Sequence, residues 1–218
     1  MNTLQKKELL WQLKTWKLIA ILLPIMVALD LTANLIGHRM ISVFGLSIYS
    51  GFVLRLITLL LLNLLRTCVR SSWPILIIVL FMILGNFIMI GYGNIINSLN
   101  TPDFFINTTA YHTVFIDAWH GMISNTIALF ICVIIELIFF NFFYFRFRLP
   151  YFLASVIATS LVLLIGSIIV MYAGYVLDYP KHIHEIIKDQ LISNFIGLAV
   201  LALLIQPLAY WIHQYYFD

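Results

Sequence analysis

Apolar residues along this chain gather in six long runs, separated by short segments that hold most of the charged and polar residues. The runs cover residues 17–36, 50–66, 73–97, 113–144, 151–177 and 188–212. Their lengths suit α-helices that cross a bilayer, which takes about 20 residues. Backbone amides in lipid have no water to bond, so every run is expected to be helical. The pattern predicts an all-α membrane protein with six transmembrane helices in a single domain, residues 1–218.

The composition strengthens this prediction. Hydrophobic residues make up 63% of the chain and charged residues only 10%, and the mean hydropathy is +1.03. A soluble domain carries roughly 25% charged residues, so the composition excludes that class. The net charge of +3 comes from the loops and does not indicate a nucleic-acid partner. Cys68 and Cys132 show no paired metal-ligand spacing, and we expect them to be packing residues.

The distribution of lysine and arginine predicts the orientation. Cytoplasmic loops of membrane proteins carry an excess of these residues. With both termini in the cytoplasm, eight cations fall on that side: Lys6, Lys7, Lys14, Lys17, Arg66, Arg70, Arg146 and Arg148. The other side receives Arg39, Lys181 and Lys188. We therefore expect a multi-pass protein of the cell (inner) membrane with both termini cytoplasmic.

The segment between the first two runs differs from the rest. Residues 37–51 are moderately apolar, too short to span, and punctuated by Gly37, Gly45 and Gly51. We expect here either an irregular loop that dips back into the protein or a short extended segment that caps it. Irregular backbone is tolerated at membrane depth only where protein or water surrounds it, so this segment is a candidate wall of a cavity.

Four ionisable residues lie inside or at the edge of the apolar runs: Asp30, Arg55, Asp117 and Glu136. Each is expected to cost about 2.5–3.5 kcal/mol on insertion scales, so such residues usually face a partner, a cavity or a substrate path. Asp30 and Arg55 form a candidate ion pair, although Arg55 could also pair with Asp117 or extend its head group into water. Glu136 is the deepest charge. It is either a proton-coupling group or a neutral acid bonded to a neighbouring helix.

Residues 34–51, NLIGHRMISVFGLSIYSG, resemble the first-loop signature of the queuosine precursor transporter family, also called the vitamin uptake transporter family. In that family an Asn ends the first span, a Lys follows five residues later, and two glycines lead into the second span. Asn34, Arg39, Gly45 and Gly51 keep these spacings. The six-span layout and the chain length are similar as well.

Further along, the resemblance is mixed. In the fourth span the family places a basic residue and, a little over four turns later, an acidic one, and His120 and Glu136 stand at those positions. Other family polar positions are replaced here, because Asn63 stands for an Asp and Thr67 for a Glu. The family also has different residues at five further positions, which are Arg55, Leu56, Leu163, Gly166 and Gly197 in this chain.

The resemblance implies an importer of a small polar heteroaromatic solute, such as a queuosine precursor of the 7-deazaguanine type or a related vitamin or nucleobase. Carboxylate, imidazole and amide groups can read the edge of such a ring. The residues expected to bind the substrate are Asn34, Arg39, Asn63, Asp117, His120, Asn125 and Glu136.

Alternatives stay open at this point. The chain could be a membrane scaffold or assembly protein without a ligand, or a substrate-binding subunit of an ATPase-driven importer. We expect no enzyme, because no nucleotide-binding loop, zinc-hydrolase motif or nucleophile motif is present. We expect no cofactor or metal. The expected partners are a small-molecule substrate and the lipid bilayer, and a homo-oligomer or an energising partner protein is left open.

Overall fold

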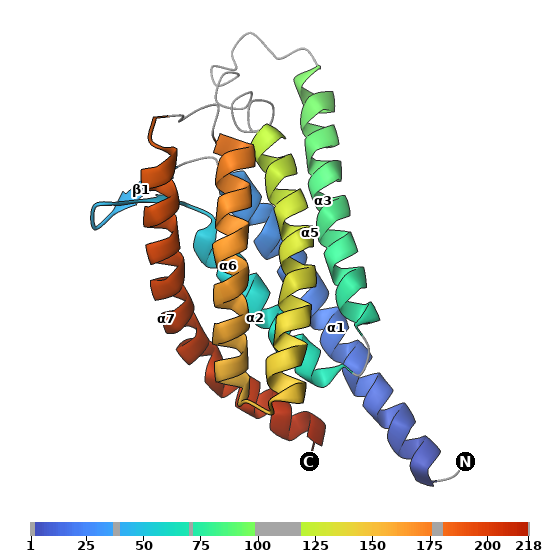
Figure 1. The fold of residues 1–218 in the computed structure, drawn as a ribbon. Coiled ribbons are helices and arrows are strands. Elements are labelled where there is room, and N and C mark those ends of the chain that lie inside the picture. Colours follow the sequence, from blue (N-terminus) through green and yellow to red (C-terminus); the bar gives the residue numbers. More distant parts are fainter. Residues whose placement is uncertain (1–2, 37–39, 70–71, 99–118, 176–180, 218) are drawn as a thin grey trace.

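The computed structural model describes residues 3–36, 40–69, 72–98, 119–175 and 181–217. Helices dominate this part of the chain, and six α-helices lie within it. Their bounds are α1 (Thr3–Ile36), α2 (Phe52–Cys68), α3 (Trp73–Asn97), α5 (Trp119–Asn141), α6 (Tyr151–Tyr175) and α7 (Ile183–Phe217). A short π-helix, η2 (Phe142–Arg146), continues α5 to the start of the link to α6. The two ends of the chain lie at the same end of the bundle (Figure 1).

Five of the described helices, α1, α3, α5, α6 and α7, are long and apolar enough to cross a membrane. This confirms the predicted all-α, multi-pass architecture at a coarse level. With 17 residues, α2 is shorter than the other five, so the sixth span stays a prediction. The expected fourth span began at residue 113, whereas α5 begins at Trp119, and residues 113–118 lie outside the described part.

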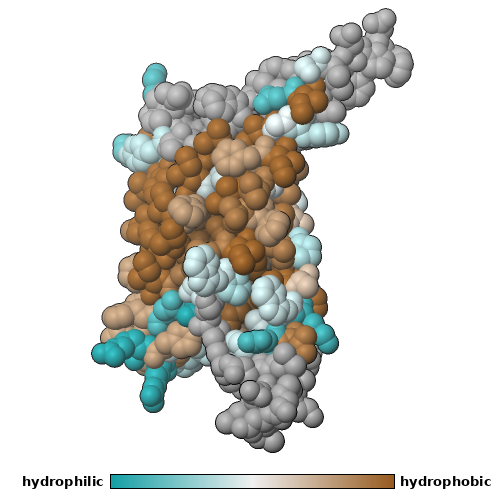
Figure 2. Space-filling model, turned by 90° about the vertical axis from the view of Figure 1, so that its right-hand side faces the viewer, coloured by the Kyte–Doolittle hydropathy of each residue, from teal (hydrophilic) through white to brown (hydrophobic). Residues whose placement is uncertain are grey.

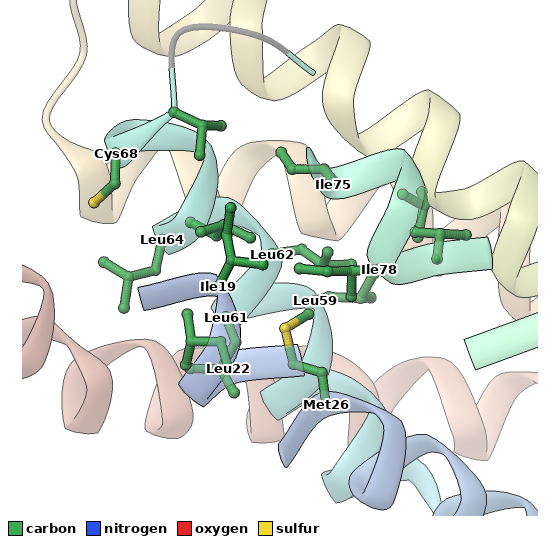
Figure 3. Close-up of a cluster of buried hydrophobic side chains, with 14 of the residues drawn as sticks. Ile19, Leu22, Met26, Leu59, Leu61, Leu62, Leu64, Cys68, Ile75 and Ile78 are labelled. Atoms are coloured by element: carbon green, nitrogen blue, oxygen red, sulfur yellow. The ribbon is translucent and has the colours of Figure 1, made fainter. Parts of the chain in front are cut away.

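The short helix α2 lies at the centre of the bundle. It contacts each of the other five described α-helices. Its run of leucines is buried on all sides, from Leu56 to Leu65, as expected of a helix that is apolar around its whole circumference. Figure 3 shows the resulting core, in which Ile19, Leu22 and Met26 of α1 meet leucines of α2 and isoleucines of α3. The central helix therefore supports side chains that face several neighbours at once.

The outer surface is apolar across the middle of the molecule. Figure 2 shows a broad hydrophobic band there, with hydrophilic residues near both ends. Large side chains such as Phe87, Ile138, Ile196 and Leu204 are exposed in this structure. Monomeric soluble proteins rarely expose continuous apolar patches of this extent. The band fits contact with lipid.

Residues 40–49 form a β-hairpin, so this part of the segment is extended, which was one of the two expected alternatives, but its regular pairing was not predicted. Strand β1 (Met40–Val43) pairs antiparallel with β2 (Leu46–Tyr49). The two turn residues Phe44 and Gly45 both have positive φ, 52° and 80°, as tight hairpin turns require. The hairpin lies beside α7, which β2 contacts (Figure 1). The part of this segment at residues 37–39 lies outside the described residues, and the re-entrant prediction remains a prediction.

Candidate functional site

A cavity lies inside the bundle, in the half away from the chain ends. It is lined by α1, α2, α5, α6 and α7, and its volume is about 80 Å³. We call it the polar cavity, after two groups of polar side chains on its walls: Asp30, Arg55 and Thr58, and Ser167, Gln190 and Asn194. Apolar side chains, including Phe52, Leu59 and Leu129, form the rest of the lining. The cavity combines hydrogen-bonding groups with apolar surface, as ligand sites do.

A chain of hydrogen bonds across three helices forms the first polar wall. Arg55 donates from Nη2 to Asn34 Oδ1 (2.5 Å), and Asn34 donates from Nδ2 to Asn86 Oδ1 (2.7 Å). Asn86 in turn donates from Nδ2 to Asp30 Oδ2 (2.7 Å). Asp30, Asn34 and Asn86 are fully buried. The wall therefore joins a buried carboxylate to a guanidinium through two amides.

In this wall Asp30 and Arg55, which the sequence suggested as an ion pair, are connected through the side chains of Asn34 and Asn86. The Arg55 charge interacts favourably with the Asp30 carboxylate, and the two asparagines supply the hydrogen bonds between them. A buried charge needs both kinds of compensation to be tolerated. Asp30 Oδ1 is buried without a hydrogen-bond partner, and Asp30 lines the cavity.

Asn86 was missed by the sequence reasoning. Its signal was a lone amide in the otherwise apolar stretch FMILGNFIMI of α3. Amides in transmembrane helices commonly bond across to a neighbouring helix. Nothing in the spacing of Asn86 within α3 identifies Asp30 and Asn34 as its partners, because they lie more than 50 residues away.

The second polar wall comes from α6 and α7. Gln190 donates from Nε2 to Asn194 Oδ1 (2.9 Å), and Asn194 donates from Nδ2 to Ser167 Oγ (2.9 Å). All three side chains are buried. Sequence reasoning missed this wall too, although Gln190 and Asn194 stand four apart and so share a helix face.

Glu136 lies outside the polar cavity, in a second polar cluster with Asn63 and Thr159. Asn63 donates from Nδ2 to Glu136 Oε1 (2.5 Å), and Thr159 donates from Oγ1 to the same oxygen (2.7 Å). Asn63 and Glu136 are each 1% exposed and Thr159 is 0% exposed. One carboxylate oxygen therefore ties together α2, α5 and α6. We call these three residues the septum.

The other end of the bundle holds a second cavity, of about 540 Å³. Its lining includes Thr67 of α2, Tyr144 of η2, Tyr151 of α6 and Gln206 of α7, together with Arg148 of the link between η2 and α6. Because that link and both chain ends lie at the same end (Figure 1), we call it the terminal-side cavity.

The septum stands between the two cavities along each of its three helices. On α2 the order is Leu59 in the polar cavity, Asn63 in the septum and Thr67 in the terminal-side cavity. On α6 the order is Val162, Thr159 and Tyr151. On α5, Cys132 lines the polar cavity one turn before Glu136, and η2 beyond it lines the other cavity. The septum therefore lies between the two cavities on α2, α5 and α6, whereas on α7 the buried residues Leu198 and Ala202 lie between them.

The predicted substrate residues are thus divided among different places. Asn34 belongs to the first polar wall, whereas Asn63 and Glu136 bond to each other in the septum. His120 and Asn125 belong to α5, but the structure does not describe their side chains. Arg39 and Asp117 lie outside the described residues. Among the residues that the structure does describe, no cluster of His, Cys, Asp and Glu could hold a metal ion.

Substitution of Gly166 by alanine is expected to destabilise the protein. Gly166 lines the polar cavity, and a Cβ atom there would lie 2.6 Å from Sγ of Cys132. Overpacking of this kind costs about 1–3 kcal/mol. Thermal unfolding in detergent measures the loss, and Gly91→Ala, whose Cβ would meet nothing within 4 Å, is the control. A loss that is no smaller in a Cys132→Ala background would refute the proposed clash.

No family model, curated protein or solved structure matches the chain. The resemblance over residues 34–51 therefore stays a prediction, and the function must be argued from the site itself.

Proposed function

We propose that the protein is a multi-pass importer that binds a small polar heteroaromatic solute in the polar cavity. The observation that carries the proposal is the pair of polar walls in the polar cavity, whose remaining lining is apolar, within a lipid-compatible bundle. One wall offers the carboxylate of Asp30 and the guanidinium of Arg55, and the other offers the amides of Gln190 and Asn194. A purine-like ring has donors and acceptors on its edge and apolar faces, so these groups suit it.

The resemblance to the queuosine precursor transporter family supports a 7-deazaguanine-type precursor as the solute, with a related vitamin or nucleobase as the alternative. In this proposal α2 is the sixth transmembrane helix, and the hairpin at residues 40–49 covers the bundle beside α7. The protein is a carrier and has no enzymatic activity.

The proposed orientation places both termini in the cytoplasm of a cell with an inner membrane. Support comes from the cations near the end where the chain begins and ends. Arg66 lies at the end of α2, Arg146 and Arg148 lie at the link between α5 and α6, and Lys14 and Lys17 lie in the first half of α1. Positive residues concentrate on the cytoplasmic side of membrane proteins.

The size of the polar cavity fits a closed state of such a carrier. Its 80 Å³ is well below the roughly 300–1,000 Å³ of ordinary small-molecule pockets. A solute of this class therefore requires side chains of the lining to move. Phe52 and Leu59, at the α2 side of the cavity, are the apolar residues that we expect to shift.

A thermal-shift screen of the purified protein tests the proposal. The screen covers purines, deazapurines, pterins and vitamins, each at high concentration. A ligand that prefers the folded state stabilises it by about 2.7 kcal/mol at 100 times its Kd. We expect 7-deazaguanine or a close relative to raise the Tm. No shift with any compound would favour a scaffold without a ligand.

A further inference from the structure

The carboxyl group of Glu136 accepts hydrogen bonds on one oxygen only. Nδ2 of Asn63 and Oγ1 of Thr159 both donate to Oε1, at 2.5 Å and 2.7 Å. Oε2 is buried and has no hydrogen-bond partner. An ionised carboxylate spreads its charge over both oxygens and can accept on both, and buried acceptors are rarely left unpaired. The pattern is therefore that of a carboxyl group whose second oxygen is not an acceptor.

Asn63 leaves the complementary group unpaired. Its Nδ2 donates to Glu136 Oε1 and, at 3.3 Å, to Thr159 Oγ1, which gives two acceptors for the two N–H bonds of the amide. Its Oδ1 is buried without a partner. Ser155, one turn from Thr159 on α6, does not supply the missing donor, because its hydroxyl is itself buried and unpartnered. An O–H group at Oε2 of Glu136 would turn one of the two unused acceptors into a donor for the other.

Glu136 has no ionic partner among the residues that the structure describes, where it bonds only to Asn63 and Thr159. Arg66 stands one turn beyond Asn63 on α2, but its guanidinium donates to the backbone at the end of that helix and to an asparagine at the end of α5. Arg55 stands two turns before Asn63 and donates to an asparagine of α1. A carboxylate buried without a cation is costly, and in practice such a group becomes neutral.

The other titratable groups around the septum do not offset a charge there. Cys132, one turn before Glu136 on α5, and Tyr151 of α6 both interact with a charge on Glu136, but a thiol and a phenol are uncharged near neutral pH. Within its bounds α3 has no Asp, Glu, Lys, Arg or His. The charged and imidazole residues of α1 and α7 stand toward the polar cavity (Asp30, His184, Glu185, Lys188 and Asp189) or toward the chain ends (Lys6, Lys7, Glu8, Lys14, Lys17 and His213).

We propose that Glu136 holds a proton on Oε2 and donates it to Oδ1 of Asn63, so that the septum contains a neutral acid–amide pair. The proton comes from water: an O–H bond forms at Oε2, the carboxylate charge disappears, and no other reactant is needed. Each of the two side chains then donates one hydrogen bond to the other, and Thr159 adds a second donor to Oε1. The protonated state is the one in which α2, α5 and α6 are fully bonded at this point. This proton site does not depend on the proposed transport function.

Binding of this proton makes the stability of the protein depend on pH. An ordinary Glu in an unfolded chain is ionised above about pH 4.3, so near neutral pH the folded state binds one proton more than the unfolded state. The contribution of Glu136 to stability is therefore complete below about pH 4.3 and falls as the pH rises, until Glu136 ionises in the folded protein as well. Within that window the unfolding equilibrium constant is expected to rise by up to about tenfold per pH unit.

Thermal unfolding of the full-length protein in detergent between about pH 5 and about pH 8 tests this dependence. Glu136→Gln places an amide N–H where the O–H would be and keeps the Oε1 acceptor, so it should fold and lose the part of the pH dependence that Glu136 causes. Its Tm should be close to that of the wild type at the acid end of the range and higher at the alkaline end. Glu185→Gln is the matched control, because the Glu185 side chain is 79% exposed and its replacement should leave the pH dependence unchanged.

Infrared spectroscopy detects the proton itself. At about pH 6.5, where an ordinary Glu is ionised, the wild type is expected to show the band of a protonated carboxyl group whose O–H donates a hydrogen bond. The band should vanish in Glu136→Gln and remain in Asp30→Asn, which replaces the other buried carboxyl group of the described residues.

Three results would overturn the proton site. One is a Glu136→Gln variant that fails to fold or that has a lower Tm than the wild type at the alkaline end. Another is an equal pH dependence of Tm in the two proteins. The third is the absence of any infrared band that depends on Glu136, because Glu136 would then be ionised and water would serve the two acceptors. A band at the frequency of a free carboxyl group would overturn the pairing with Asn63.

Discussion

Replacement of Arg55 by methionine is expected to lower the free energy of unfolding by about 3 kcal/mol, the lower end of the range for breaking a buried charge pair. The lower end applies because Arg55 is only half-buried. The substitution removes the cation that offsets the Asp30 carboxylate, which is itself 1% exposed. It also leaves Asn34 Oδ1 without its donor. Denaturant or thermal unfolding in detergent measures the loss, and solute uptake should disappear with it.

Removing both charges should restore most of the stability. A buried pair replaced by apolar residues is often neutral or even stabilising, whereas half a pair is not. We expect Asp30→Leu with Arg55→Met to be more stable than Arg55→Met alone. The surface control is Arg146→Met, because Arg146 is exposed and such changes stay within about 0.5 kcal/mol. A double variant no more stable than the single one would contradict the coupling of Asp30 to Arg55.

The second large effect is expected from Ala128→Leu, which should abolish solute binding and leave the fold intact. Ala128 is 1% exposed and lies on the α5 side of the polar cavity. The larger side chain would occupy the 80 Å³ of space there. Filling a cavity commonly stabilises a protein by about 0.5–2 kcal/mol, so the Tm should stay constant or rise. The ligand-induced thermal shift and the uptake should both be lost.

A matched substitution on the lipid-facing side controls for the added bulk. Ala199 of α7 is exposed, so Ala199→Leu is expected to bind and transport like the wild type. If Ala128→Leu also binds and transports normally, the polar cavity does not hold the solute.

The sequence predicts the helices well because length and hydropathy decide them. Each of the six long apolar runs corresponds to one of the described helices. The hairpin at residues 40–49 was less accessible, because the sequence FG in its turn is a weaker hairpin signal than Asn-Gly or Asp-Gly. Its strands are only four residues long, which is short for periodicity to identify.

The sequence predicts several individual residues of the candidate site, but it does not predict which side chains contact each other. Asp30, Arg55 and Glu136 stood out because charged groups in apolar runs are costly, and Asn34 stood out through the family resemblance. Their partners Asn86 and Asn63 lie 56 and 73 residues from the carboxylates they bond. Hydropathy within one helix carries no information on which neighbour its polar face meets. The separation of Glu136 from the polar cavity, with a second cavity beyond it, likewise follows only from the packing of α2, α5 and α6.

Leu163 and Gly166, which stand where the transporter family that residues 34–51 resemble has polar groups, both line the polar cavity. The polar groups of the cavity lie mainly on α1, α2 and α7, and Ser167 is the polar lining residue of α6. If the chain is an importer of the proposed kind, its solute is recognised mainly from those helices.

Solute uptake by purified protein in liposomes shows whether the polar cavity carries a solute across the membrane. Labelled 7-deazaguanine, guanine and a pterin are offered to liposomes that contain the wild type, Ala128→Leu or Ala199→Leu. We expect saturable uptake of at least one compound by the wild type and by Ala199→Leu, and none by Ala128→Leu. Equal uptake by Ala128→Leu, or no uptake of any compound by a folded wild type, would contradict this expectation.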